Sequence, residues 1–374
     1  PAYAVGSIDL PVPPKQRTLA VEVAPAAAKL GPGESTTIAL VVKDANGRPV
    51  ADAEAAVIVV DEAAMVGTRK VLRLLDHARR ADAKVVLVGD PCQLPEIEAG
   101  GAFVGLRQRL SASYLADNRR QREPWERAAL ARLRTGDTDT AIDTYIERGR
   151  VEVAPTGAEA RSRMIGDWLD ARRTGTAVML ASRRVDVDAL NRYARRALRK
   201  DGALGADKII IAGHGYTEGD IVVALRNDRR LGLLNGTRAT VDAIDTHAQV
   251  MRCRADDDQA VTIPFDYAAD GHLTHGYATT IHKSQGATYD RCLILAGDHL
   301  TKESAYTAMS RGRIDNTLYL VDDGDRATDS HTNEIESSLV DRVRSSISRT
   351  AAQSMAVDQT PASHDDDLDF EIDL

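Results

Sequence analysis

An apolar, β-branched run that ends in two acidic residues constrains this sequence most. Val57-Ile58-Val59-Val60 is predicted to form a buried strand, and Asp61-Glu62 follow it directly. In magnesium-dependent ATPases, one carboxylate at such a strand end holds the metal and a second one orients the attacking water. A site of this kind also needs a glycine-rich phosphate loop that ends in Gly-Lys-Ser/Thr. The 374 residues contain no Gly-Lys dipeptide.

The pattern of the chain from Val57 onward favours an α/β fold. Buried strands alternate with helices rich in Ala, Arg and Leu, which is typical of a parallel sheet. The predicted strands cover residues 57–60, 85–88, 177–181, 293–295 and 318–321, and the predicted helices cover 68–82, 126–134, 137–147 and 187–199. Residues from about 203 to 270 turn β-rich again, which predicts a small inserted β-barrel.

The two ends of the chain differ from this middle part. Residues 1–56 contain alternating strands at 18–24 and 36–43, with turn signals at 31–34 and 44–47, and are predicted to be β-rich and sandwich-like. Residues 327–374 are expected to form an amphipathic helix and then a disordered acidic tail. Because the chain begins at Pro1 and not at Met, we expect it to be a piece of a longer product.

Composition excludes few functional classes. The net charge is -8, from 48 basic and 56 acidic residues, and the acidic tail carries six of these negative charges, so the remainder is at about -2. Bulk charge therefore neither requires nor excludes nucleic acid as a partner. Three cysteines lie far apart without CxxC spacing, which favours a reducing compartment and no cysteine metal site. No stretch approaches the ~18 apolar residues that a membrane span needs.

Two further segments carry polar groups suited to phosphate chemistry. Gly89-Asp90-Pro91-Cys92-Gln93 follows a predicted strand, and the Gln93 amide can sense a γ-phosphate. Asn118-Arg119-Arg120-Gln121 precedes a helix, and an arginine there can stabilise a transferring phosphoryl group. Alone, the first would be an ordinary turn and the second a solvated charged face. After an acidic strand end, the first favours a nucleotide site.

Two segments near the C-terminus complete the set. His275 to Thr288 combines hydroxyl residues, His282, Lys283 and a glycine, which are donors suited to a nucleic-acid backbone. Tyr306 to Arg313 is predicted to pack through its apolar face while Arg311 acts across a domain cleft, as an arginine finger does.

In their order, these five segments resemble superfamily 1 helicases of the RecD-like branch, and most closely the helicase part of conjugative relaxases. In that family, DEAxM, GDxxQLP, an Arg-Gln segment, TxHKSQGxT and YxAxSRxR occur in the same order. Here Asp61 to Met65 resembles motif II of the family, Gly89 to Pro95 resembles motif III, and Arg120-Gln121 resembles motif IV. Thr279 to Thr288 resembles motif V, and Tyr306 to Arg313 resembles motif VI. The resemblance covers about residues 57–321 and implies two RecA-like (P-loop NTPase-type) parallel sheets, the first of them incomplete.

The resemblance also implies a division into domains. A partial first RecA-like domain would occupy residues 57–150 with motifs II to IV. A second would occupy 151–326 with motifs V and VI, and the insert at about 203–270 would be the small β-domain of the family. Asn227 and Asn235-Gly236 lie in that insert.

By resemblance, Asp61 binds Mg²⁺ and Glu62 activates water, while Gln93, Arg120 and Arg311 contact the γ-phosphate. Further implied nucleotide-binding residues are Gly89, Asp90, Gln285 and Gly286, and the implied DNA-binding residues are Thr279, His282, Lys283 and Ser284. The family uses ATP to translocate 5′ to 3′ on single-stranded DNA, as its two RecA-like domains close on ATP and open after hydrolysis. Its setting implies a cytoplasmic location, conjugation or DNA-processing proteins as further partners, and no membrane.

The N-terminal segment departs from this family, which carries its P-loop ahead of motif II. Residues 1–56 instead resemble a β-sandwich domain of bacterial alpha-2-macroglobulins, which are secreted protease traps. Both resemblances share Val59-Val60-Asp61-Glu62-Ala63. We therefore hypothesise a chimera of two unrelated genes joined at that string, by recombination or by sequence assembly.

Three functional hypotheses remain open. The chain is the C-terminal motor portion of a DNA helicase with impaired ATP binding, a non-catalytic remnant that binds single-stranded DNA, or a secreted macroglobulin-like fragment. The first two differ only in ATP turnover, and the missing Gly-Lys-Ser/Thr predicts that turnover is near background. The third explains none of the segments after residue 63.

Overall fold

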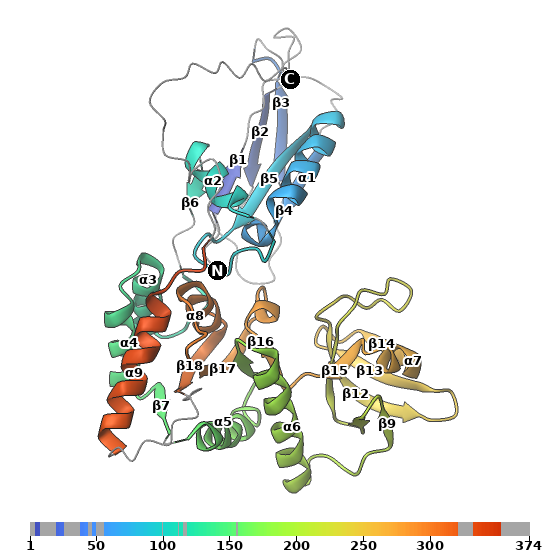
Figure 1. Cartoon of the computed structure of the whole chain (residues 1–374). Coiled ribbons are helices and arrows are strands. Elements are labelled where there is room, and N and C mark those ends of the chain that lie inside the picture. The colour runs from blue at the N-terminus through green and yellow to red at the C-terminus, as the bar shows by residue number, and fades with distance from the viewer. Residues whose placement is uncertain are drawn as a thin grey trace. The chain divides into compact units, whose positions relative to one another are not determined.

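The computed structural model describes residues 4–7, 20–25, 38–43, 47–49, 56–98, 100–110, 112–114, 118–154, 156–320 and 332–352. The chain divides into two compact units, each described here by itself (Figure 1). The larger unit contains residues 92–94 and 118–351, and the smaller unit contains 2–91, 95–117 and 352–374.

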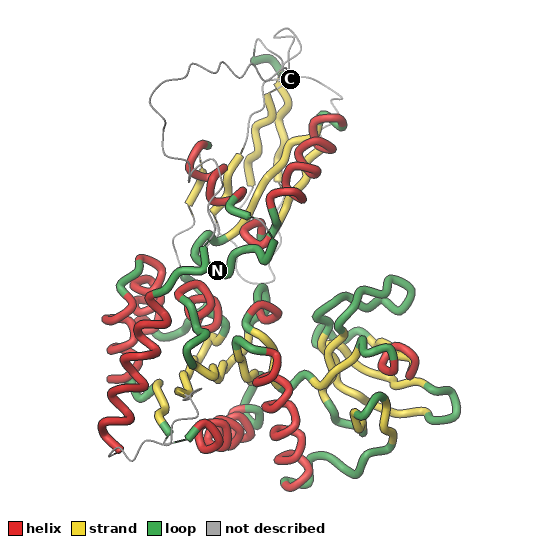
Figure 2. Tube along the Cα trace, in the orientation of Figure 1, coloured by secondary structure: helices red, strands yellow, loops and turns green. Residues whose placement is uncertain are grey.

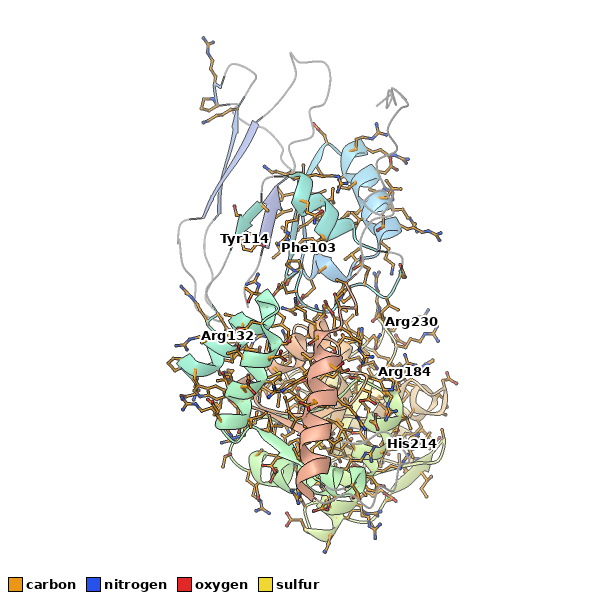
Figure 3. All side chains as sticks on the ribbon, turned by 60° about the vertical axis from the view of Figure 1, so that its left-hand side comes forward. Phe103, Tyr114, Arg132, Arg184, His214 and Arg230 are labelled. Carbon is orange, nitrogen blue, oxygen red and sulfur yellow. The ribbon has the colours of Figure 1, made fainter. Side chains whose placement is uncertain are left out.

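A parallel strand pair forms the core of the smaller unit. β4 (Ala56–Val60) runs parallel to β5 (Ala83–Gly89), and α1 (Thr68–Arg80) connects them. Ala78 of α1 packs in one cluster with Val85 and Leu87 of β5, to which Phe103 of α2 (Ala102–Arg109) also belongs (Figure 3). The buried positions of β5 alternate because successive side chains of a strand point to opposite faces.

The next position in this sheet is filled from the N-terminal segment. β1 (Ala4–Ser7) pairs antiparallel with both β5 and β6 (Ala112–Tyr114), so the strand order is β4-β5-β1-β6. Strand β1 was not predicted from the sequence. Strands were predicted at 18–24 and 36–43, and they correspond to β2 (Ala20–Pro25) and β3 (Ile38–Lys43), which the structure pairs antiparallel in a separate sheet. The predicted turn at 31–34, residues 44–46 of the second turn and the acidic tail beyond 352 lie outside the described residues.

A parallel sheet forms the centre of the larger unit. Its described strands follow the order β16-β8-β17-β18-β7, and every pairing between them is parallel. The strands are β7 (Val151–Val153), β8 (Ala177–Ala181), β16 (Ala278–Thr280), β17 (Tyr289–Ala296) and β18 (Gly312–Leu320). The predicted α/β class with a parallel, RecA-like sheet is confirmed.

Helices cover both faces of this sheet. Val178 and Leu180 of β8 belong to a cluster with α3 (Pro124–Thr135), α4 (Thr138–Glu147), α8 (Lys302–Met309) and α9 (Thr332–Ser348). Met179 and Ala181 belong to the opposite cluster with α5 (Gly157–Ala171) and α6 (Arg184–Lys200). Strands buried on both faces read as continuous apolar runs, which is why the sequence predicted β8 with its observed bounds.

We expected residues 118–150 to belong to the first domain, with a boundary at residue 150. These residues belong to the larger unit, not to the smaller one that contains motif II. The reason is packing, because Leu130 and Leu133 of α3 and Ile142 of α4 are buried in the same cluster as β18. Such contacts between distant segments leave no periodic signal in the sequence.

The insert between α6 and β16 is a β-domain of its own (Figure 2). Its described strands form an antiparallel sheet in the order β14-β13-β12-β11-β15, beside the hairpin of β9 and β10. The bounds are β9 (Ile209–Ile211), β10 (His214–Tyr216), β11 (Ile221–Ala224), β12 (Arg238–Asp245), β13 (Val250–Ala255), β14 (Ala260–Pro264), α7 (Phe265–Ala269) and β15 (Leu273–His275). In this part of the chain the pairing runs from β14 to β15 as an open sheet, where we expected a barrel.

Within the described residues, no helix combines the length and apolar character that crossing a bilayer requires. No disulfide joins Cys92, Cys253 and Cys292, and the last two are buried.

Candidate functional site

The acidic pair lies at the carboxyl end of β4 in the smaller unit. Asp61 is exposed, and its Oδ1 accepts a hydrogen bond from the Glu62 backbone N–H at 2.8 Å. Glu62 has φ 50° and ψ 39°, in the left-handed region, and it begins the short helix η2 (Ala63–Met65). Non-glycine residues adopt this conformation infrequently, and they gather at functional sites. The turn thus places two successive carboxylates at a strand end.

The end of β5 lies directly beside this turn. Gly89 approaches η2 so closely that a Cβ on it would lie 3.1 Å from the Ala64 nitrogen and 3.2 Å from the Ala63 nitrogen. Asp90 follows and is buried. Because β4 and β5 are parallel neighbours, their carboxyl ends meet at one edge of the sheet.

These carboxylates fit a magnesium ion that is shared with a phosphate. Mg²⁺ uses one or two protein carboxylates, water and substrate phosphates, in preference to a cage of protein ligands. Among the described residues, no group of three or more His, Cys, Asp or Glu side chains is arranged to hold a metal. Asp61 and Glu62 supply two adjacent carboxylates, which is as many protein ligands as such a magnesium site uses.

Arg311 is the centre of a buried polar cluster in the larger unit. Its side chain is 1% exposed, and its Nη2 donates to Gln93 Oε1 at 3.2 Å and to Ser310 Oγ at 2.8 Å. Its Nε donates to the Thr307 carbonyl at 2.9 Å. Nη1 lies 3.5 Å from the carbonyl of Ala287, which directly follows Gln285 and Gly286. Motifs III, V and VI therefore meet at the Arg311 guanidinium.

The Arg120-Gln121 segment binds the backbone on both sides of Arg311. Arg120 Nη1 donates to the Ser310 carbonyl at 2.9 Å, and Gln121 Nε2 donates to the carbonyls of Ser310 and Gly312 at 3.0 and 2.9 Å. Gln121 is 1% exposed, and its Oε1 accepts no hydrogen bond from the described part of the chain. We had selected Arg120 as a site residue and missed Gln121, although the two are adjacent in the motif.

The buried carboxylate of Glu126 is linked through Asn316 to the backbone of Gly312. Asn316 Oδ1 accepts from the Gly312 N–H at 2.8 Å, and its Nδ2 donates to Glu126 Oε1 at 2.8 Å. Burial raises the pKa of the Glu126 carboxyl to about 7, against the lowering effect of hydrogen bonds from Asn316 and Tyr145. The sequence analysis missed Glu126 and Asn316, because nothing local marks a glutamate in an amphipathic helix as buried.

The segment expected to face DNA begins on the edge strand β16. Thr279 is half-buried on β16, and His282 and Lys283 lie in the short helix η3 (His282–Ser284), with Lys283 exposed. Burial lowers the pKa values of both His282 and Lys283. Ser284 differs from the expectation, because it is fully buried and its hydroxyl donates to the Ile281 carbonyl at 2.8 Å. In this structure Ser284 closes the turn of η3.

Arg184 is a second cation at the same edge of the sheet. It is exposed at the first residue of α6, directly after β8, and its charge contributes to the lowered pKa of Lys283 (Figure 3). Because β8 and β16 are parallel neighbours, Thr280 pairs with Ala181 and the two strands end together. Two neighbouring cations at a helix N-terminus suit an anionic backbone. The signal we missed was Ser182-Arg183-Arg184 after a predicted strand.

Several known proteins are similar to this chain. A family model described as an AAA domain matches residues 18–156. Conjugal transfer protein TraA from Rhizobium radiobacter is 38% identical over 278 residues, which cover 73% of this chain and 25% of that protein. The ATP-dependent RecD2 DNA helicase from Deinococcus radiodurans is 31% identical over 265 residues, which cover 68% of this chain and 35% of that protein.

The chain therefore spans about a quarter to a third of the length of these relatives. A crystal structure of Pif1 helicase from Bacteroides with ADP-AlF3 and single-stranded DNA is 18% identical with a TM-score of 0.47, over 75% of this chain and 74% of that one. A likeness at this level carries no argument about function. The AAA-domain match begins at residue 18, so it includes most of the segment that we expected to be foreign. These similarities do not support the macroglobulin resemblance or the chimera, which remain hypotheses. The chain is similar to relaxase and RecD-type helicase proteins.

Proposed function

We propose that this chain is the motor portion of a relaxase-type DNA helicase that binds single-stranded DNA and is impaired in ATP binding. The cluster around Arg311 is the observation that carries the proposal. It brings together residues that are far apart in the sequence. Arg120 binds the carbonyl of Ser310, 190 residues away, and Arg311 binds Gln93, 218 residues away. Gln93 and Arg311 are buried, Arg120 is partly buried, and an amide with two guanidinium groups is suited to sensing a phosphoryl group.

The DNA-binding part of the proposal rests on the edge formed by β8 and β16. Lys283 and Arg184 supply charge to phosphates, while Thr279 and His282 supply hydrogen-bonding groups. With its pKa lowered by burial, His282 is neutral at pH 7 and can both donate and accept. Ser284 contributes indirectly by fixing η3. We propose single-stranded DNA as the track and 5′ to 3′ as the direction, by analogy with the family.

The ATP part rests on two opposing features. Asp61 would hold Mg²⁺ and Glu62 would orient water, with Gly89, Asp90, Gln285 and Gly286 near the nucleotide, but the sequence offers no lysine-bearing phosphate loop. The nearest string within the AAA-domain match is Gly33-Glu34-Ser35, in which a glutamate takes the place of the lysine. A phosphate loop leads into a helix, whereas this string leads into strand β3. In sequence, this string offers a negative charge where the phosphate loop has its lysine.

A nucleotide titration tests the ATP part. We expect a fluorescent ATP analogue to bind the wild-type chain more weakly than the micromolar range, and Glu34→Lys to bring no gain because the following strand is unchanged. Micromolar affinity in the wild type would refute the impaired-binding proposal. A large gain in Glu34→Lys would show that a phosphate loop does form at this string.

An oligonucleotide titration tests the DNA part. We expect Lys283→Ala and Arg184→Ala each to weaken binding of labelled oligothymidine several-fold, on the order of 1 kcal/mol per lost phosphate contact. Arg173→Ala is the matched control, because Arg173 is an exposed arginine before β8, at the opposite end of that strand from Arg184. Equal losses in all three variants, or no binding by the wild type, would contradict the proposed DNA site.

A non-catalytic single-stranded-DNA-binding module is the second candidate. The absence of Gly-Lys from the sequence favours it, and it shares the β8–β16 edge with the first. Strand displacement from substrates with a 5′ or a 3′ tail separates the two, since only a motor unwinds and only a 5′ to 3′ motor selects the 5′ tail. We also propose a cytoplasmic location, with conjugation or DNA-processing proteins as partners.

A further inference from the structure

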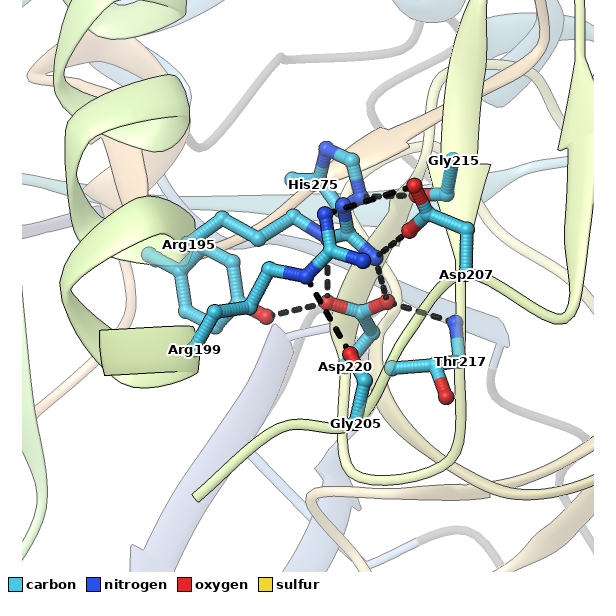
Figure 4. A network of polar contacts seen from close by, with 9 residues as sticks. Arg195, Arg199, Gly205, Asp207, Gly215, Thr217, Asp220 and His275 are labelled. Carbon is cyan, nitrogen blue, oxygen red and sulfur yellow. Dashed lines mark hydrogen bonds and ion pairs between the residues drawn. The ribbon is translucent and has the colours of Figure 1, made fainter. Parts of the chain in front are cut away.

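Helix α6 holds the β-domain insert through a buried ion pair. Arg195 donates to both oxygens of Asp220, from Nε at 2.9 Å and from Nη2 at 3.0 Å (Figure 4). Asp220 is fully buried and directly precedes β11 of the insert. Asp207, at the start of the insert, also binds Arg195, and it forms a 3.4 Å ion pair with Arg199 of α6. Two arginines thus balance two carboxylates.

The same carboxylate also holds the residue that leads into the DNA-facing segment. The Tyr277 hydroxyl donates to Asp220 Oδ1 at 2.5 Å, and the Thr217 N–H donates to Oδ2 at 2.7 Å. Tyr277 is 0% exposed and directly precedes β16. Asp220 therefore joins α6, the insert and the start of β16. We call Arg195, Asp207, Asp220 and Tyr277 the Arg195 clamp.

Asn191, one turn before Arg195 in α6, also binds the first residue of β16. Asn191 Oδ1 accepts from the Ala278 N–H at 2.8 Å, and its Nδ2 donates to the Ala278 carbonyl at 3.2 Å. Asn191 and Arg195 are four residues apart and therefore lie on one face of the helix. Gly276 permits the close approach of the connecting chain, since a Cβ there would lie 2.6 Å from Val223 Cγ2.

Aromatic packing encloses the clamp. Tyr277 packs edge-on against Trp168 of α5 at 5.6 Å and stacks on His275 at 6.0 Å. Burial lowers the pKa of His275 to about 4, so this ring is neutral at physiological pH. His275 opened the string that we expected to be functional, yet its ring is part of this core and its Nε2 lies 3.0 Å from the Gly215 carbonyl.

We propose that Asp220 and Tyr277 are positioning residues that fix the β-domain insert and the DNA-facing segment 279–283 in one arrangement on helix α6. Replacing a buried ion pair with apolar residues is frequently neutral for stability, so the best-attested use of such a pair is to specify one arrangement among several. Among the described residues, the chain enters the insert near residue 207 and leaves it near residue 277, and the Arg195 clamp holds both of these points. This inference rests on the proposed binding of single-stranded DNA.

Tyr277→Phe is the most conservative test, because it removes one hydroxyl and leaves the Arg195–Asp220 pair. Tyr319→Phe is its matched control. Tyr319 is likewise buried, and its hydroxyl donates to Asp167 Oδ2 at 2.6 Å, but it lies in β18, away from β16. We expect Tyr277→Phe to weaken oligothymidine binding on the order of fivefold, and Tyr319→Phe to leave it unchanged at a similar loss of melting temperature. Equal affinities in the two variants would overturn the proposal.

A distance measurement without DNA separates this inference from the proposed function. Spin labels at Ser162→Cys on α5 and Asp257→Cys in the insert, both exposed, would be placed in a Cys92→Ser background. We expect one narrow distance distribution in the parent and Tyr319→Phe, and a broader one in Tyr277→Phe and Asp220→Asn. An unchanged distribution in both clamp variants would refute the clamp. Broadening in a chain that binds no oligothymidine would confirm the clamp and refute the proposed function.

Discussion

Replacing Glu126 with glutamine removes one buried ionisable group from the core of the larger unit. Glutamine keeps the size of the side chain and an oxygen that can accept from Asn316 and Tyr145, so the packing should persist. The change abolishes only the titration of the carboxyl. Tyr145, Asp315 and Arg150 are the ionisable groups whose charge or hydrogen bonding acts on it.

The expected magnitude follows from the pKa. Burial raises the pKa of Glu126 from 4.5 to about 7, so the native chain binds this proton more tightly than the unfolded chain does. The stabilisation is fully present below pH 4.5 and is lost as the pH rises through about 7. At about 1.4 kcal/mol for each pH unit between the two values, the loss is roughly 3 kcal/mol. The free energy of unfolding of Glu126→Gln should therefore rise relative to wild type by roughly 2 to 3 kcal/mol between pH 5 and pH 8.5.

Urea unfolding followed by tryptophan fluorescence measures this difference. Both tryptophans, Trp125 and Trp168, lie in the larger unit, so the signal reports the unit that contains Glu126. Glu123→Gln is the control, because it removes an exposed carboxyl at the start of the same helix. A wild type and a Glu126→Gln variant with the same pH dependence would show that the carboxyl is not buried as described.

Three further predictions use the same structure. Gly312→Ala should destabilise the larger unit by about 1–3 kcal/mol in urea unfolding. The new Cβ would lie 2.2 Å from the Asp315 carbonyl oxygen and 2.6 Å from Asn316 Oδ1. An unchanged free energy of unfolding would refute this tight packing. Gly166→Ala in α5, where no atom lies within 4 Å of the new Cβ, should instead stabilise by up to about 1 kcal/mol, and a loss would contradict the open space. Lys283→Ala should reduce the salt dependence of oligothymidine binding by about one in log–log slope, whereas an unchanged slope would mean that Lys283 contacts no phosphate.

The sequence predicted the elements that have strong local periodicity. The helix predicted at 68–82 is α1 (Thr68–Arg80), and the strand predicted at 177–181 is β8. The approach of Asp61-Glu62 to Gly89 was not predicted, because it depends on the pairing of β4 with β5. Local pattern is sufficient to predict single helices and strands.

Contacts between distant segments could not be predicted in this way. The packing of α3 and α4 onto the second sheet depends on shape complementarity over more than a hundred residues. Ser284 illustrates the same limit, since a hydroxyl in a polar string can face a ligand or close its own turn. Strand β1 was missed because Ala4-Val5-Gly6-Ser7 lacks an alternating pattern, and its pairing is set by the strands on either side of it.

Residues within a motif that is expected to bind DNA can have a structural role instead. His275, Gly276 and Tyr277 lie within the string that resembles a DNA-binding motif, yet they are buried in the connection to the β-domain insert. Arg195 and Asp220, which hold this connection, carry no motif and lie 25 residues apart in the sequence. A buried arginine can be recognised from a sequence only when its partner is already known.

DNA-stimulated ATP hydrolysis by the purified chain, with Glu62→Gln beside it, tests the central claim most directly. We expect turnover near background in both proteins, while oligothymidine still binds and Lys283→Ala weakens that binding. Turnover in the wild type that is lost in Glu62→Gln would contradict the proposed impairment of ATP binding, because Asp61 and Glu62 would then be acting on a nucleotide held by another phosphate site.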